Sequence, residues 1–170
     1  GLSLGAQYQG QDDTDKDPTK QHGNGYGFSL GYDNIADSGV SAIAAYTNSS
    51  VTAQQKQNGW DGENAEFWGA GLKYDANAIY VATMYGESHN LIQDADKAEH
   101  FEAMAAYVFD FGLRPAVSFL MSKGRDLHAA GGADNPAGVD DKDLVKYMDI
   151  GATYYFNKNM STYVDYKINL

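Results

Sequence analysis

Nine charged side chains fall at alternate positions within runs of small, aliphatic and aromatic residues. They are Asp33, Lys73, Asp75, Glu102, Asp110, Arg114, Asp149, Asp165 and Lys167. Alternate residues of an extended strand point to the same face, so these charges lie on the face opposite their apolar neighbours. Fixed charges on a wetted surface attract counter-ions, repel co-ions and orient polar solutes. With six acids against three bases, the set predicts a mild preference for cations.

A structural interpretation competes with this one for each of the nine charges. An exposed charge is often only solvated, or it forms a weak ion pair with a cross-strand neighbour. Asp110 and Arg114 flank a glycine corner, so an ion pair that holds the turn explains them as well as a contact with solutes. Lys73, Glu102 and Asp149 lie nearer the middle of their runs and are the better candidates for solute contact.

The sequence gives metal binding and catalysis little support. Its four histidines have no metal-ligand spacing. Two acidic clusters contain weak candidates for loose Ca²⁺ or Mg²⁺ binding, Asp94 with Asp96 and Asp140 with Asp141. Solvated loop charge is the preferred interpretation of both clusters, so we predict no metal site and no cofactor. No Ser-His-Asp grouping or Cys nucleophile stands out, and we predict that the chain is not an enzyme.

Alternation of apolar and polar residues with a period of two predicts nine strands. Near the end of the chain, for example, Val164 and Tyr166 alternate with Asp165 and Lys167. The predicted strands are Leu2–Gln9, Gly25–Asp33, Val40–Thr47, Ala65–Asp75, Ala78–Glu87, Glu99–Phe111, Leu113–Lys123, Leu144–Phe156 and Ser161–Asn169. Each has one face of Tyr, Phe, Leu and Ala, whereas the other face is small or polar.

The linkers between these strands alternate between long and short. The long ones are Gly10–Asn24, Asn48–Asn64, Ser88–Ala98 and Gly124–Asp143, and the short ones are Asn34–Gly39, the Ala76-Asn77 corner, Gly112 and Asn157–Met160. Aromatic residues gather in two bands at the strand ends, as in a lipid-facing belt. Short turns at one end, long loops at the other and strands of membrane-crossing length are typical of transmembrane β-barrels. The predicted fold is therefore all-β, an antiparallel meander.

Two other interpretations stay open. A soluble β-sandwich or lipocalin-like binding module would bury the apolar face and place Trp60 or Trp68 in a ligand site. A sandwich concentrates aromatic residues at mid-strand, where its core is thickest, and here they lie at the strand ends. A receptor or adhesion role for the long loops is compatible with a barrel, because such loops form its exposed surface.

The overall composition fits one segment without an internal domain boundary over residues 1–170. No run approaches the roughly 18 apolar residues of a transmembrane helix. The net charge of -11 argues against a nucleic-acid partner, because phosphate binding needs clustered Lys and Arg. There is no Cys, hence no disulfide framework. With neither a starting Met nor a signal peptide, Gly1 is interpreted as an internal or processed start.

Three stretches closely resemble the general diffusion porins of enterobacterial outer membranes. They are GLKYDANAIY from Gly71 to Tyr80, FDFGLRP from Phe109 to Pro115, and the segment from Val145 to Ile168 with its GATYYFNKNMSTYVDYKI run. The resemblance covers essentially the whole chain, and the long loops diverge. It implies a segment of a sixteen-stranded barrel in the bacterial outer membrane. It also implies a homotrimer, passive diffusion of small hydrophilic solutes, and contact with membrane lipid and lipopolysaccharide.

The resemblance further implies that the chain corresponds to about the second half of such a porin. In the family order, the constriction loop and most of the basic wall opposite it precede Gly1, and a closing strand follows Leu170. Nine strands alone leave two open edges, and unpaired backbone groups in lipid cost several kcal/mol each. We therefore expect the chain to be an excerpt of a longer porin or one piece of an assembly.

Overall fold

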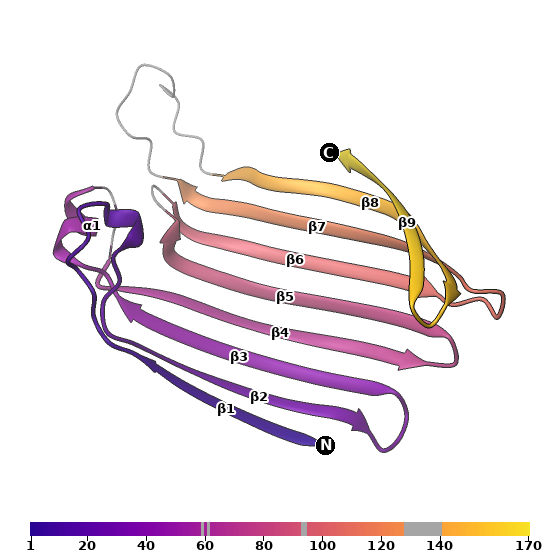
Figure 1. Cartoon of the computed structure of the whole chain (residues 1–170). Helices are drawn as coiled ribbons and strands as arrows, with labels where there is room; N and C mark the ends of the chain where they lie inside the picture. The colour runs from indigo at the N-terminus through magenta and orange to yellow at the C-terminus, as the bar shows by residue number, and fades with distance from the viewer. Residues whose placement is uncertain (59, 61, 93–94, 128–140) are drawn as a thin grey trace.

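The computed structural model describes residues 1–58, 60, 62–92, 95–127 and 141–170, and its strands form one nine-stranded antiparallel sheet (Figure 1). The strands follow one another across the sheet in chain order, which confirms the predicted meander. Their bounds are β1 Leu2–Gln9, β2 Gly25–Ile35, β3 Val40–Ser50, β4 Asn64–Ala76, β5 Ile79–Ile92, β6 Ala95–Tyr107, β7 Leu113–Leu127, β8 Asp141–Asn157 and β9 Met160–Asn169.

At the end of the sheet where the long loops lie, several strands run further than predicted. The ladder between β5 and β6 continues through the pair His89 and Lys97, so the predicted long linker Ser88–Ala98 is wrong. The predicted linker Gly124–Asp143 is also too long, because β7 and β8 pair until only 128–140 separates them, outside the described residues. Lys97, Arg125 and Asp141, which were predicted to lie in loops, are paired with charged residues of neighbouring strands here.

Short turns connect the strands at the opposite end. Asn77 and Ala78 form a two-residue turn with φ of 54° and 64°, the conformation that matches the twist of a tight hairpin. The predicted one-residue corner at Gly112 is wrong, since the connection between β6 and β7 spans residues 108–112. It is closed by two hydrogen bonds, from the Phe109 N–H to the Leu113 carbonyl at 2.8 Å and from the Gly112 N–H to the Phe109 carbonyl at 2.9 Å.

Gly112 is expected to be sensitive to substitution. Its φ of +92° favours glycine, and an added Cβ would meet the Tyr155 carbonyl oxygen at 2.5 Å. Gly112→Ala should therefore lower the free energy of unfolding by about 1–3 kcal/mol. Urea titration of the porin containing these strands, refolded into lipid vesicles, measures this. Gly10→Ala is the control, because nothing lies within 4 Å of the Cβ it would add; equal midpoints for the two variants would contradict the strain argument.

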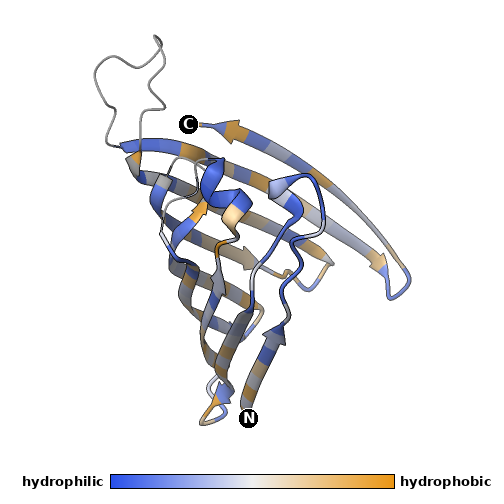
Figure 2. Cartoon of the chain, turned by 90° about the vertical axis from the view of Figure 1, so that its left-hand side faces the viewer, coloured by the Kyte–Doolittle hydropathy of each residue, from blue (hydrophilic) through white to orange (hydrophobic). Residues whose placement is uncertain are grey.

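The sheet has two chemically distinct faces. Residues directly opposite each other in the ladder share a face, and this divides the strands into a polar face, which carries Lys73, Glu102 and Asp149, and an apolar face, which carries Leu72 and Ile150. Figure 2 shows the sheet bent into an open trough with its two edge strands curving to the same side. Leu72 and Ile150 remain 58% and 50% exposed, so large apolar side chains lie uncovered.

A two-sheet sandwich is not what these strands form. All nine belong to one sheet, and the apolar residues buried in the described part of the chain are only Val51, Ala98 and Ala106. The sandwich interpretation needed a covered apolar face. Trp68 lies on the apolar face, 41% exposed and edge-on to Tyr85 at a ring distance of 5.8 Å, so it does not line an enclosed ligand site.

Two short helices lie at the long-loop end, and neither was predicted. They are the 3₁₀ helix η1, Pro18–Lys20, and the helix α1, Ala53–Gln57. Thr52 and Gln55 form a reciprocal capping box at the start of α1. No helix among the described residues is long and apolar enough to cross a membrane.

A buried glutamine joins the two loops that carry these helices. Gln21 is 4% exposed, and its Oε1 accepts a hydrogen bond of 2.8 Å from the Thr52 hydroxyl. Its Nε2 donates to Gln54 and to the Asp15 carbonyl, while Gln55 Nε2 donates to the Gln21 carbonyl at 2.9 Å. Because the buried amide is hydrogen-bonded at both of its polar atoms, these contacts fasten loop 10–24 to loop 51–63.

Candidate functional site

Eight of the nine charges singled out in the sequence share the polar face. One row of directly paired residues runs across six strands, through Lys73, Ala82, Met104, Ser118, Asp149 and Lys167. The next row towards the short turns joins Asp75 to Asp165, through Tyr80, Ala106, Ala116 and Gly151. Glu102 and Arg114 lie on the same face by alternation from Met104 and Ala116. Asp33 joins them through its contacts with Ser41 and Lys73.

Asp110 is separated from this set. It lies in the connection between β6 and β7, so the alternation used to place it does not apply. Arg114 contacts Tyr80. Its guanidinium carbon lies 5.7 Å from the centre of the Tyr80 ring, close enough for a cation–π contact.

The charges on the polar face differ in how well they are neutralised. Asp33 Oδ1 accepts a hydrogen bond of 2.6 Å from the Ser41 hydroxyl and lies 3.4 Å from Lys73 Nζ. Lys167 Nζ lies 3.7 Å from the centre of the Tyr147 ring. Asp149 is directly opposite Lys167 in the ladder, yet its Oδ1 is buried without a hydrogen-bond partner among the described residues. The wall thus combines a paired charge, a cation over a ring and an unsatisfied carboxylate oxygen.

His100 belongs to the polar face and was missed as part of the site. It bridges two serines, with Ser88 Oγ 3.1 Å from its Nε2 and Ser122 Oγ 3.1 Å from its Nδ1. The Phe67 ring packs beside it at a centroid distance of 6.1 Å. The sequence could have placed it there. His100 stands two residues from Glu102 in the same strand, and period-2 alternation puts both on one face.

A second group of charges lies on the apolar face near the long loops, and we call it the ionic ladder. It consists of Glu87, Lys97, Glu99, Lys123, Arg125 and Asp141. Lys97 Nζ lies 3.1 Å from Glu87 and 3.6 Å from Glu99, and the Arg125 guanidinium lies 2.8 Å from Glu99. Because these charges neutralise one another across β5 to β8, the strands can continue where the sequence predicted loops.

The weak metal candidates do not come together. Asp94 and Asp140 lie outside the described residues. Asp141 pairs with Lys123 at 3.1 Å and with Arg125, and Asp96 lies near the start of β6. Within the described ranges, no group of three His, Asp or Glu side chains is arranged to hold a metal ion.

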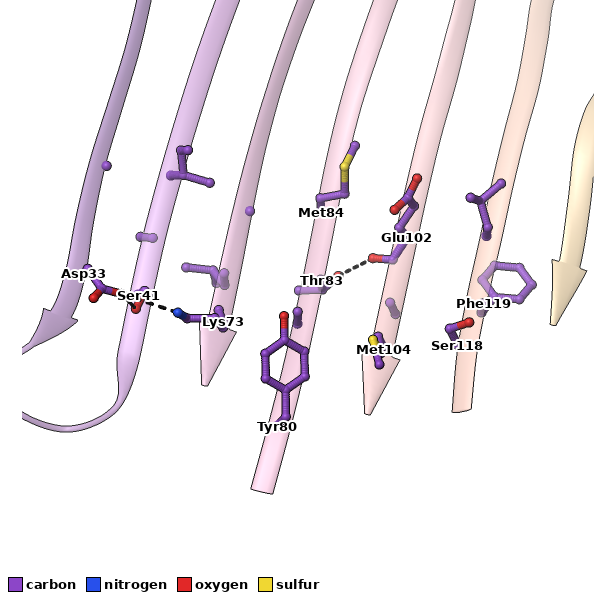
Figure 3. Close-up of a pocket in the computed structure, with 18 of the residues that line it drawn as sticks. Asp33, Ser41, Lys73, Tyr80, Thr83, Met84, Glu102, Met104, Ser118 and Phe119 are labelled. Carbon is purple, nitrogen blue, oxygen red and sulfur yellow. Dashed lines mark hydrogen bonds and ion pairs between the residues drawn. The ribbon is translucent and has the colours of Figure 1, made fainter. Parts of the chain in front are cut away.

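The polar face also contains a groove, shown in Figure 3. It has a volume of about 650 Å³ and runs across the strands from β1 to β8. Glu102, Lys73 and Asp33 supply its charged groups, and the side chains of Met84 and Glu102 extend in the same direction from neighbouring strands (Figure 3). This curved, charged face and its apolar reverse are what a wall between water and lipid requires.

Comparison with known proteins agrees with that geometry. All 170 residues match the Gram-negative porin family. The chain belongs to this family. Its localisation is accordingly the bacterial outer membrane.

The relatives of this porin are similar along its whole length. It is 58% identical to outer membrane porin N of Escherichia coli K12 over 188 aligned residues, which cover 100% of the chain and 49% of the relative. It is 49% identical to outer membrane porin PhoE of the same organism, with 99% of the chain and 46% of the relative covered. The chain thus spans about half the length of the curated relatives it matches.

A solved structure gives the corresponding comparison in three dimensions. OmpF of Salmonella typhi, in complex with daunomycin, matches with a TM-score of 0.84 and 41% sequence identity, covering 100% of this chain and 50% of that one. OmpF is a sixteen-stranded barrel, so the nine-stranded sheet of this porin is confirmed as part of such a barrel.

Proposed function

We propose that the polar face lines a water-filled β-barrel channel through which small hydrophilic solutes and ions diffuse passively. The row from Lys73 to Lys167 carries this proposal, because it places two lysines, a serine and an aspartate on one side of a sheet of six consecutive strands, with only Ala82 and Met104 between them. The opposite side exposes aliphatic and aromatic residues that suit lipid. The function needs no cofactor and no catalytic group, since pore width and wall charge filter the solutes.

We further propose a mild cation preference for the channel. Among the charges singled out in the sequence, those on the polar face are the acids Asp33, Asp75, Glu102, Asp149 and Asp165 against the bases Lys73, Arg114 and Lys167. This excess of acids would raise the local cation concentration in a narrow aqueous path. The partly neutralised Asp33 contributes least, whereas Glu102 and Asp149 contribute most.

The assembly and the lipid partner are proposed on separate grounds. Membership of the porin family supports a homotrimer. The cations of the ionic ladder, Lys97, Lys123 and Arg125, lie at the loop end of the apolar face, where lipid phosphates would be in reach. Their position supports lipopolysaccharide as a partner. The relative OmpF binds daunomycin, which supports small organic molecules among the solutes that reach the polar face.

Vesicle swelling tests the proposed channel directly. The porin that contains these strands is reconstituted into vesicles, and swelling is followed by light scattering in isotonic neutral sugars of increasing size. We expect fast swelling with monosaccharides and much slower swelling with larger sugars. The reason is that a pore of fixed width separates neutral sugars by size. Vesicles that swell no faster than protein-free controls would contradict the proposed function.

A further inference from the structure

The groove on the polar face is more apolar than ion passage requires. One row of residues that pair directly from strand to strand crosses it, and it consists of Ile43, Gly71, Met84, Glu102 and Leu120. Three of the four side chains in this row are aliphatic or thioether groups, and the fourth is the carboxylate. The volume of about 650 Å³ lies within the range of about 300–1,000 Å³ typical of small-molecule sites.

A glycine makes room in this row. A Cβ added at Gly71 would meet the Thr83 carbonyl oxygen at 3.3 Å, Ile43 Cγ2 at 3.4 Å and Met84 Cβ at 3.6 Å, so the side chains that flank the space above Gly71 are apolar. Met84 on one side and Ile43 on the other therefore form the walls of a recess one side chain wide. A slender alkyl or aryl segment fits this recess better than a hydrated ion does.

The groove carries a net negative charge centred on Glu102. Asp33 and Lys73, the other charged residues of the lining, form an ion pair with N–O distance 3.4 Å and offset each other. The Glu102 side chain is exposed and has no hydrogen-bond or ion-pair partner in the described part of the chain; only its backbone carbonyl is engaged, by the Thr83 hydroxyl at 3.1 Å (Figure 3). Met84 and Leu120 are its direct neighbours across the ladder.

We propose that this groove is a subsite for amphipathic monocations, with the ammonium group at the Glu102 carboxylate and the apolar segment in the recess between Met84 and Ile43. Charge complementarity selects this class over its alternatives. An anion would be repelled by the unpaired Glu102 carboxylate. A neutral apolar molecule would gain no electrostatic attraction from it. A small inorganic cation gains nothing from the apolar recess. The inference rests on the proposed function, because the solute reaches the groove from the lumen.

The test uses current block in planar bilayers containing the porin with these strands. The probes are n-butylammonium, n-hexylammonium and n-octylammonium, with n-hexanoate as the charge-reversed control. We expect reversible block by the ammonium series, with an affinity that rises about twofold or more for each added methylene pair, since each methylene enters apolar surroundings. Hexanoate should block at least several-fold more weakly.

Two variants locate the site. Glu102→Gln should weaken hexylammonium block by roughly three- to fivefold, the scale of one exposed ion pair. Met84→Gln should keep the charge dependence but flatten the chain-length dependence. Asp165→Asn is the matched control, because it removes one carboxylate from the same face outside the groove; its block should stay within about 1.5-fold of the unchanged protein.

The outcomes separate this inference from the proposed channel. An open channel whose ammonium block is independent of chain length, or is weakened equally by Asp165→Asn and Glu102→Gln, overturns the subsite and leaves the channel standing. A reconstituted protein that passes no current at all would instead contradict the proposed channel function.

Discussion

Replacing Val117 by Arg should lower the free energy of unfolding by about 2–4 kcal/mol, whereas replacing the adjacent Ser118 by Arg should change it by less than about 1 kcal/mol. Val117 lies on the apolar face between Ala105 and Ile150 and is 44% exposed. There an Arg side chain would stand in the hydrocarbon layer. Ser118 lies on the polar face opposite Asp149, so an Arg at 118 would meet water and an unsatisfied carboxylate oxygen.

Urea unfolding in lipid vesicles measures both variants, with the unfolding free energy obtained by linear extrapolation. The two positions are neighbours in one strand and receive the same residue, so length, charge and intrinsic strand preference are matched. The reverse order of stabilities would mean that the faces are exchanged. Equal losses would mean that neither face contacts lipid.

A second large effect is expected on ion selectivity. Replacing Glu102 and Asp149 together by Lys should lower the cation/anion permeability ratio several-fold at low salt, without abolishing conductance. Wall charges shift local ion concentrations through the field they create, whereas the width of a barrel is set by strand number and shear. In about 1 M salt, where the Debye length falls to about 3 Å, the effect should shrink.

Reversal potentials in planar bilayers under a salt gradient provide this measurement. The neutral double variant with Gln at 102 and Asn at 149 is the control, and its shift in the logarithm of the ratio should be about half as large. An unchanged ratio at low salt would show that these two residues do not face the path of the ions. Selectivity would then be set by strands that this chain does not contain.

Alternation along the chain was sufficient to predict the strands and their faces. β1 has the predicted bounds, Leu2–Gln9, and the other strands differ mainly at their ends. Alternation works here because every strand separates polar from apolar surroundings, so a shift of one residue would invert its whole pattern. The charges of the polar face follow from the same rule, which is why only Asp110, in a turn, lies apart.

Features that depend on partners elsewhere in the chain were not predictable in this way. Glu99 and Arg125 are polar residues near predicted loops, and only their pairing at 2.8 Å across β6 and β7 explains why the strands continue. Gln21 gives no local sign that it will be buried against Thr52. The start of α1 did carry a readable signal, because Thr52 and Gln55 have the spacing of a capping box.

The central claim, that the polar face meets water and the apolar face meets lipid, is tested most directly by cysteine accessibility along β8. The chain contains no Cys, so single cysteines can be introduced one at a time at positions 148, 149, 150, 152, 153, 154 and 155. Gly151 is omitted because an added Cβ would meet Asp165 Oδ1 at 2.9 Å. With a charged, membrane-impermeant thiol reagent, we predict fast labelling at 149, 153 and 155 and slow labelling at 148, 150, 152 and 154. Fast labelling at the even positions, or equal rates at all of them, would contradict the account.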